Sequence, residues 1–219
     1  MSRKNPIAIE LFSGCGGLST GLLDAGIRVV AGYDHDERAI QGFRYNHEYR
    51  GSSGFVCDLT KVSGKDLLQM AGLNSIDLLA GGPPCQSFSV VGKRQGLDDE
   101  RGQLVFDFLR FIKDLSPRAV LFENVANLAT INDGSILRLI KRRLESWGYV
   151  VKAHVCSAAD YGVPQMRKRL LVLAARDVTA LEMPPVTHGP PNLLWKDSRP
   201  RLLVAGERVL LASNKPLAQ

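Results

Sequence analysis

The chain has 219 residues, 45% of them hydrophobic and 23% charged, with 28 Lys and Arg against 22 Asp and Glu, for a formal net charge of +6. These values fit one globular domain with a short appendage at most and argue against a disordered chain, a signal peptide or a transmembrane helix. The four scattered cysteines include no CxxC pair, so we expect no metal, no disulfide framework and an intracellular, cytoplasmic location, associated with the nucleoid if the source is prokaryotic.

Strand-like and helix-like segments alternate along the chain. Short apolar runs that end at glycines or acids are typical of buried strands, and helical spacing that stops at glycine is typical of helices. This alternation predicts a doubly wound, mostly parallel α/β sheet. We predict strands at 6–12, 28–33, 55–56, 76–80, 118–122, 149–155 and 170–174, and helices at 17–25, 37–47, 63–71, 105–115 and 135–147, with a loop over 81–102.

The positive charge is concentrated in one segment. Residues 138–176 hold nine basic and two acidic side chains, a sum of +7, which leaves −1 for the rest of the chain. A basic region on a near-neutral body favours a polyanion as partner, because Lys and Arg that neutralise phosphates release counterions. A solvated helix face would give the same pattern, and charge alone does not decide between the two.

The first candidate site is the glycine-rich turn after the first predicted strand, residues 12–17 (FSGCGG). Glycines at such a turn let the backbone approach a ligand and aim amide N–H groups at it. The turn is not a GxGxxG, but Asp34 follows Gly14 by 20 residues, where an acid can accept hydrogen bonds from ribose hydroxyls. The pair indicates an adenosine-type cofactor, and a glycine turn without a ligand is the alternative.

The second candidate site is residues 81–87 (GGPPCQS), after the fourth predicted strand. Two prolines stiffen the backbone just before Cys85, and a nucleophilic cysteine needs a fixed, accessible position. Such a sequence is hard to explain by packing alone. Cys15, Cys57 and Cys156 lack this setting, so we expect them to be buried and inert.

Two acids follow other predicted strands at the same edge. Asp58 follows the third strand, where ligands gather in sheets of this kind, although a helix N-cap is the alternative and Ser63 competes for that role. Glu123 opens the run Glu123-Asn124-Val125 directly after the fifth strand. In a closed apolar site the pKa of its carboxyl would be raised and it could act as an acid near neutral pH. A helix-capping acid is the alternative here too.

The third group of polar residues lies in segment 165–169 (QMRKR), which enters the last predicted strand. Alternate side chains of an extended segment share a face, so Gln165, Arg167 and Arg169 would point the same way. Guanidinium groups suit phosphates and the carbonyl oxygens of bases. An edge strand protected by its charges is the alternative.

Taken in order, these motifs resemble the cytosine-C5 DNA methyltransferase family. The ordered set is far more specific than any one motif, and it covers roughly residues 6–190. The resemblance rests on the turn 12–17, Asp34, Asp58, Pro84-Cys85-Gln86, Glu123-Asn124-Val125 and Gln165-x-Arg167-x-Arg169, with 92–104 and Pro185-x-Thr187-His188 similar as well.

The resemblance implies a Rossmann-like methyltransferase fold, S-adenosyl-L-methionine as methyl donor and cytosine in double-stranded DNA as acceptor, as in restriction-modification systems. Cys85 would attack C6 of a flipped cytosine, Glu123 would contact N3 and the amino edge, and Arg169 the base carbonyl. Arg167 would support the loop or a phosphate. Substrate or DNA contacts would come from Gln86, Ser87 and Gln165. Cofactor contacts would come from Phe12, Gly14, Gly16, Gly17, Leu18, Asp34, Asp58, Leu59, Pro84 and Leu104.

The end of the chain departs from the family pattern. We expect residues 1–185 to form the catalytic and cofactor-binding domain, and residues 186–219 to be a proline-rich tail or the start of a recognition region. Family members that act alone carry a variable recognition segment and a final Asn-containing motif, and neither is found here. This predicts a complementary chain that supplies both, or a truncated copy. A non-catalytic module that binds cofactor or protein, and an RNA substrate, are the alternatives.

Overall fold

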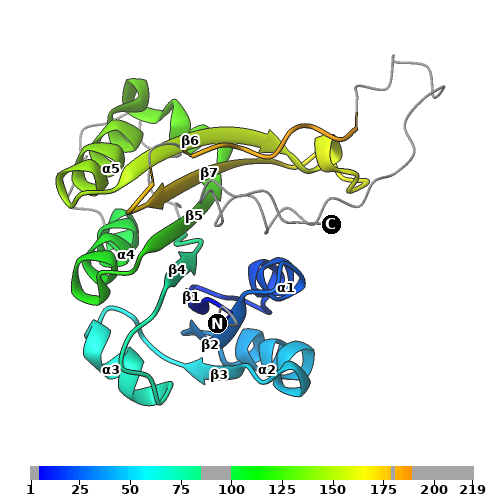
Figure 1. Cartoon of the computed structure of the whole chain (residues 1–219), viewed down its shortest axis with the longest axis vertical. Coiled ribbons are helices and arrows are strands. Elements are labelled where there is room, and N and C mark those ends of the chain that lie inside the picture. The colour runs from blue at the N-terminus through cyan, green and yellow to red at the C-terminus, as the bar shows by residue number, and fades with distance from the viewer. Residues whose placement is uncertain (1–4, 85–99, 179–180, 189–219) are drawn as a thin grey trace.

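The computed structural model describes residues 5–84, 100–178 and 181–188, so Cys85, Gln86 and Ser87 lie outside the described residues (Figure 1). Seven strands form one sheet in the order β3-β2-β1-β4-β5-β7-β6. The pairs from β3 to β5 in this order are parallel, and β7 pairs antiparallel with both β5 and β6, so among the described strands β7 alone runs against the others. The strands are β1 (Ile7–Leu11), β2 (Arg28–Asp34), β3 (Ser53–Val56), β4 (Leu78–Gly81), β5 (Ala119–Val125), β6 (Val150–Ser157) and β7 (Lys168–Ala175).

Five α-helices cover the two faces of this sheet. In Figure 1, α1 and α2 lie on one side of it and α3, α4 and α5 on the other. Their bounds are α1 (Gly17–Asp24), α2 (Glu37–His47), α3 (Gly64–Met70), α4 (Glu100–Leu115) and α5 (Ser135–Ser146), with short 3-10 turns η1 (Glu48–Arg50), η2 (Ala126–Ala129), η3 (Ile131–Gly134) and η4 (Ala158–Tyr161). The predicted doubly wound, mostly parallel α/β fold is confirmed. None of the described helices is both long and apolar enough to span a membrane.

Local side-chain chemistry explains where two of the helices begin. The Asp36 carboxylate accepts a hydrogen bond from the Ala39 amide at 3.0 Å and caps α2. Ser63 caps α3 through a capping box with Asp66, in which each side chain accepts a hydrogen bond from the other's backbone amide. Ser63, and not Asp58, is therefore the cap of this helix, which leaves Asp58 on the loop before it.

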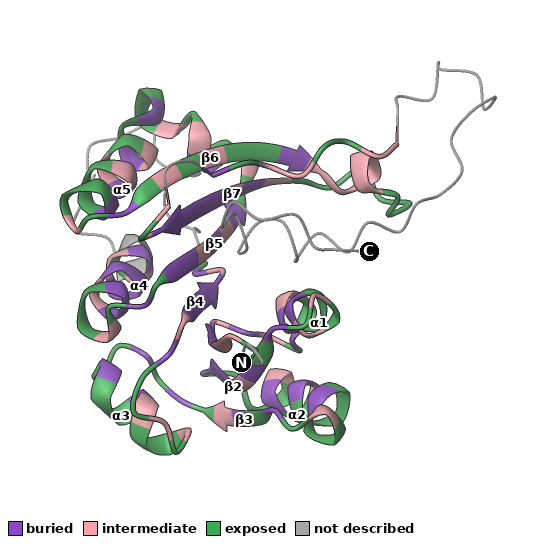
Figure 2. Cartoon of the chain, viewed as in Figure 1, coloured by how far each residue is buried: buried purple, intermediate pink, exposed green. Residues whose placement is uncertain are grey.

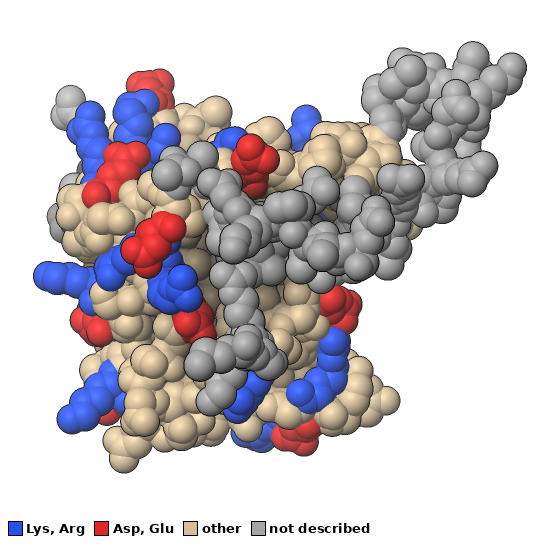
Figure 3. Space-filling view, viewed as in Figure 1, with Lys and Arg blue, Asp and Glu red and all other residues tan. Residues whose placement is uncertain are grey.

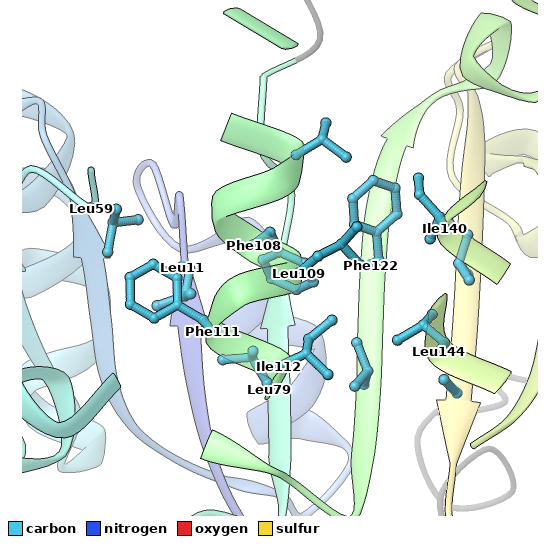
Figure 4. Close-up of a cluster of buried hydrophobic side chains, with 14 of the residues drawn as sticks. Leu11, Leu59, Leu79, Phe108, Leu109, Phe111, Ile112, Phe122, Ile140 and Leu144 are labelled. Carbon is cyan, nitrogen blue, oxygen red and sulfur yellow. The ribbon is translucent and has the colours of Figure 1, made fainter. Parts of the chain in front are cut away.

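The five central strands of the sheet are largely buried, which explains their continuous apolar runs, whereas residues of the edge strand β6 are mostly exposed or half-buried. Along β1, Ile9 packs in the larger hydrophobic cluster with α4 and α5, whereas its neighbour Ala8 packs in a second cluster on the α1 side. Phe108 and Phe122 lie at the centre of the larger cluster, with ring centroids 5.6 Å apart (Figure 4). Figure 2 shows the buried strands between helices whose outer faces are exposed. This core fixes the carboxyl ends of the parallel strands at one edge.

Three details differ from the prediction. Helix α4 begins at Glu100, inside the predicted loop. Strand β5 continues to Val125, because antiparallel pairing with β7 runs as far as Val125 and Arg169, so Glu123 lies within the strand and not after it. Strand β7 begins at Lys168, two residues before the predicted start, and the amides of Gln165 and Arg167 donate to carbonyls two residues earlier, which makes tight turns just before the strand. The predicted extended face therefore does not form over residues 165–167.

Candidate active site

A pocket lies at the carboxyl ends of the first four strands. It encloses about 1120 Å³, including its open mouth, and the turns after β1 to β4 line it together with α4. Six of the ten residues predicted to bind the cofactor line this pocket. The lining residues are Phe12, Asp34, His35, Cys57, Asp58, Leu59, Gly82, Pro84 and Leu104.

The other four predicted residues belong to the glycine turn and the start of α1. Gly14, Gly16 and Gly17 are not among the lining residues, and Leu18 lines a separate apolar groove of about 870 Å³ between α1 and the sheet. The Gly14 amide donates to Asp34 Oδ2 at 2.9 Å. That N–H group is therefore aimed at a carboxylate of the protein, and not at the pocket as the sequence suggested.

Two side chains at the end of α2 contact backbone carbonyls of the same glycine turn. Asn46 Nδ2 donates to the Cys15 carbonyl at 3.1 Å, and His47 Nε2 lies 3.0 Å from the Gly16 carbonyl. Gly16 has a φ of +88°, and a Cβ on it would collide with the His47 ring. A glycine is required there for both reasons. The glycine turn is thus fixed by its protein neighbours before any ligand arrives.

Asp34 ends β2 and is nearly buried, with 9% of its surface exposed. Besides the Gly14 amide, it accepts the Asp36 amide at 3.0 Å, and His35 Nδ1 lies 3.2 Å from Oδ1. Oδ2, which has the Gly14 amide as its donor among the described residues, can accept a further hydrogen bond, as a ribose hydroxyl would require. His35 lines the pocket and was missed by the sequence reasoning, although its place next to Asp34 could have indicated it.

Asp58 and Leu59 line the pocket on the side of β3. The Asp58 carboxylate accepts hydrogen bonds from the Thr60 amide and hydroxyl at 3.1 and 2.7 Å, and lies 2.9 Å from Lys61 Nζ. These contacts, the Thr60 hydroxyl above all, lower the pKa of Asp58 to about 2. Leu59 is buried against the core and supplies an apolar wall. The pocket therefore has an ionised acid beside an apolar surface.

Glu10 is a buried acid that the sequence reasoning also missed. It lies on β1 with 3% of its surface exposed, and its carboxyl accepts the Ser19 amide at 2.9 Å and contacts the Ser19 hydroxyl. Burial raises the pKa of Glu10 to about 8, against the two Ser19 hydrogen bonds, which lower it. The sequence signal that could have indicated this role is a glutamate inside an otherwise apolar strand. The contacts of Glu10 with Ser19 connect β1 to the first turn of α1.

Next to Gly82, which lines the pocket, Glu123 and Arg169 form an ion pair. Arg169 Nε lies 2.8 Å from Glu123 Oε1, and the side chains are 25% and 31% exposed. The sequence placed both in the catalytic group, and antiparallel pairing of β5 with β7 brings them together. Among the described residues, the charged neighbour of Glu123 is thus a guanidinium group.

This ion pair lies next to the loop that leads into Cys85. Glu123 Oε2 would be 2.9 Å from a Cβ placed on Gly82, so the carboxyl group packs directly on that glycine. Asn124 Nδ2 donates to the Pro83 carbonyl at 2.8 Å. Residues 123 and 124 of β5 therefore both contact the loop after β4, and Pro84 of that loop lines the pocket.

The remaining predicted site residues are less closely placed. Gln165 and Arg167 are exposed, and neither makes a hydrogen bond to the Glu123–Arg169 pair within the described part of the chain. Cys57 and Cys156 are buried free thiols as predicted, whereas Cys15 is exposed. Across residues 5–84, 100–178 and 181–188, no group of three His, Cys, Asp or Glu side chains is arranged to hold a metal ion.

Known proteins of one family are similar to this chain in sequence and in fold. The model of the C-5 cytosine-specific DNA methylase family matches residues 7–199. Type II methyltransferase M.AquIA of Picosynechococcus is 37% identical over 84% of this chain and 77% of its own length, and M.XorII of Xanthomonas oryzae is 40% identical over 78% and 41%. The crystal structure of an E. coli prophage protein superposes with a TM-score of 0.71 at 28% identity, over 85% of this chain and 52% of that one. The chain thus spans less than half of M.XorII.

Proposed function

Because the chain belongs to the C-5 cytosine-specific DNA methylase family, we propose that it transfers a methyl group from S-adenosyl-L-methionine to C5 of a cytosine in double-stranded DNA. The observation that carries this proposal is the Glu123–Arg169 pair, packed on the loop that leads into Cys85 and beside the pocket at the strand ends. We propose residues 1–185 as the catalytic and cofactor-binding domain, with recognition of the DNA sequence contributed from beyond it.

The pocket has the chemistry that an adenosyl cofactor needs. Asp34 can accept hydrogen bonds from ribose hydroxyls, Leu59 and Leu104 offer apolar walls for the adenine, and Asp58 can accept from its amino group. S-adenosyl-L-methionine supplies an electrophilic methyl group on a sulfonium centre. Gly14, Gly16, Gly17 and Leu18 belong to the turn after Phe12 and to the start of α1, and they stay predicted cofactor contacts.

The ion pair suits the hydrogen-bonding edge of cytosine. A carboxyl group can meet N3 and the exocyclic amino group, and a guanidinium can donate to the carbonyl oxygen. In the duplex this edge is paired, so the base must be flipped out to reach Glu123 and Arg169. We therefore assign Glu123 and Arg169 to the recognition and activation of one extruded pyrimidine.

Cys85 is assigned the covalent step. Its thiolate would add to C6 and form a C6–S bond, and the electron pair of the C5–C6 double bond would become available at C5 to take the methyl group, with S-adenosylhomocysteine as the leaving group. The protonated Glu123 carboxyl would donate to N3 and so stabilise the negative charge that develops there during this addition. A base then removes the C5 proton, the C6–S bond breaks, and the double bond is restored. Gln86, Ser87, Gln165 and Arg167 stay predicted DNA contacts.

The basic segment supports a DNA partner. Arg138 and Lys141 line a surface hollow of about 840 Å³ at the start of α5, just after β5. Figure 3 shows Lys and Arg gathered over α5, with some acidic side chains among them. We propose that this surface meets the phosphate backbone, which positions the duplex without reading its sequence.

The test is transfer of tritiated methyl groups to unmethylated genomic DNA and to tRNA. The chain should be assayed alone and with the product of the open reading frame that follows its gene, since a complementary chain is predicted. Label in 5-methylcytosine of DNA, absent in Cys85→Ser, is the expected result. Label in tRNA alone would replace DNA by RNA as substrate. Cofactor binding with no transfer under either condition would favour a non-catalytic binding module.

A further inference from the structure

Arg110 of α4 joins this helix to the loop between β3 and α3. Its Nη1 donates to the Val62 carbonyl at 2.8 Å and its Nη2 donates to the Leu59 carbonyl at 2.9 Å. Leu59 lies in the turn that follows β3 and Val62 lies just before the cap of α3, in a segment that belongs to no strand. One guanidinium group therefore satisfies two backbone acceptors 48 and 51 residues away in sequence.

We propose that Arg110 is a positioning residue for the adenosyl side of the cofactor pocket, an inference that rests on the proposed function. The loop that it holds carries Asp58 and Leu59, which both line the pocket. Leu104, six residues before Arg110 on the same helix, also lines the pocket. Arg110 thus fixes the distance between two walls of the space that the adenine would occupy.

The guanidinium group is itself held in place. Asp107 Oδ1 accepts from Nη2 at 3.2 Å and from Nε at 3.3 Å, and Asp107 is buried, with 6% of its surface exposed. The group also lies 4.2 Å from the centre of the Phe111 ring. Figure 4 places Phe111 near Leu59 among the buried side chains beside α4. A fork fixed by a buried acid and a ring loses little freedom when it binds two carbonyls, which makes it suited to positioning.

The chain offers a matched control in Arg44. Its Nε and Nη2 both donate to the Gly54 carbonyl, at 3.0 and 2.8 Å. Gly54 lies on β3, close in sequence to the same loop, but it does not line the pocket. Loss of Arg44 removes the same kind of side-chain-to-backbone hydrogen bonds, but from strand β3 and not from the loop that follows it. If the arginines only stabilise the fold, their loss should weaken cofactor binding equally in both cases. If Arg110 positions the pocket, only its loss should weaken binding.

The experiment compares the full-length chain with its Arg110→Met, Arg110→Lys and Arg44→Met variants. Binding of S-adenosylhomocysteine is measured by calorimetry, and amide hydrogen exchange of residues 58–63 is measured without ligand. In Arg110→Met we expect about a tenfold rise in Kd, which corresponds to one disturbed wall of the pocket, and faster exchange in this loop. Arg110→Lys, which keeps the charge without the fork, should lie between it and the native chain. Arg44→Met should bind within about twofold of the native chain.

Equal losses of binding in Arg110→Met and Arg44→Met would overturn the proposal, because they would mean general destabilisation. Unchanged binding in Arg110→Met would overturn it as well. If Arg110→Met does not fold, the same criteria apply to Arg110→Lys. If the native chain fails to bind S-adenosylhomocysteine, the proposed function fails, and exchange alone then decides whether Arg110 orders the loop: unchanged exchange would refute this, and faster exchange confined to 58–63 would support it.

Discussion

The acids on the two sides of the site differ in what already satisfies them. On the cofactor side, Glu10 is bonded to Ser19, and Asp34 is bonded to the amides of Gly14 and Asp36. On the base side, Glu123 is partly exposed and, in the part of the chain that the structure describes, its charged partner is Arg169. The cofactor side is thus organised by the fold itself, whereas the base side presents a pair of charged groups that can exchange partners with a ligand.

The largest effect is expected on the base side. Glu123→Gln keeps the size of the side chain but removes its charge and the carboxyl proton that it would donate to N3 of the base. We expect the rate of methyl transfer to fall by about 10²- to 10³-fold, which lies within the range by which the loss of a general acid or base slows an enzyme. Calorimetry of the same variant should give a Kd for S-adenosylhomocysteine within about twofold of the native value. A large loss of cofactor binding would erase the distinction between the two sides.

A smaller loss is expected from Asp34→Ala on the cofactor side. The variant removes the acceptor for ribose hydroxyls and releases the Gly14 amide, so both the ligand and the turn are affected. We expect the Kd for S-adenosylhomocysteine to rise by about 10- to 100-fold, as for one or two hydrogen bonds to a charged group. The contrasting measurement is covalent trapping of DNA. Its rate should fall less in Asp34→Ala than in Glu123→Gln.

Gly16→Ala tests whether the fold itself holds the glycine turn. The backbone at Gly16 has a φ of +88°, and the new Cβ would collide with His47 and lie 2.9 Å from the Phe43 ring. We expect the free energy of unfolding to fall by about 2 kcal/mol or more, measured by urea denaturation. Gly14→Ala is the control, because it has a positive φ but open space around it. Gly14→Ala should lower the free energy of unfolding by about 1 kcal/mol. An equal loss in both variants would argue against a glycine turn that is held by the contacts of Gly16 with His47 and Phe43.

The smallest effect concerns Glu10 and pH. The pKa of Glu10 is raised from 4.5 to about 8, so the folded state holds a proton that the unfolded state has lost between these values. This contribution to stability is complete below pH 4.5 and is lost as the pH rises to about 8. Glu10→Gln removes it. Between pH 6.5 and 7.5 the native chain should lose about 1 kcal/mol relative to the variant, and parallel pH profiles in urea denaturation would contradict the assignment.

Much of this organisation was predictable from the sequence, for reasons that lie in particular residues. Buried strands read as apolar runs, and the cap at Ser63 and the glycine after α3 mark a helix locally. The ordered motifs also indicated the family. The acid at the end of β2 was predicted from its spacing to Gly14, and the structure joins the two by a hydrogen bond.

What the sequence could not provide depends on contacts between distant segments. The length of β5 follows from its pairing with β7, which places Val125 opposite Arg169. The tight turns at Gln165 and Arg167 remove an alternation that local reasoning had assumed. Glu10 and Arg110 act through partners nine and about fifty residues away. No local pattern shows such partners, so these residues were missed.

The central claim is that Cys85 and the Glu123–Arg169 pair act on one flipped cytosine. The most direct measurement is covalent trapping on duplex DNA that carries 5-fluorocytosine, in the presence of S-adenosyl-L-methionine and the predicted complementary chain. The account predicts a stable adduct through Cys85, which peptide mapping would locate, with no adduct in Cys85→Ser and a much slower one in Glu123→Gln. An adduct on another cysteine, or trapping that is equally fast in Glu123→Gln, would contradict it.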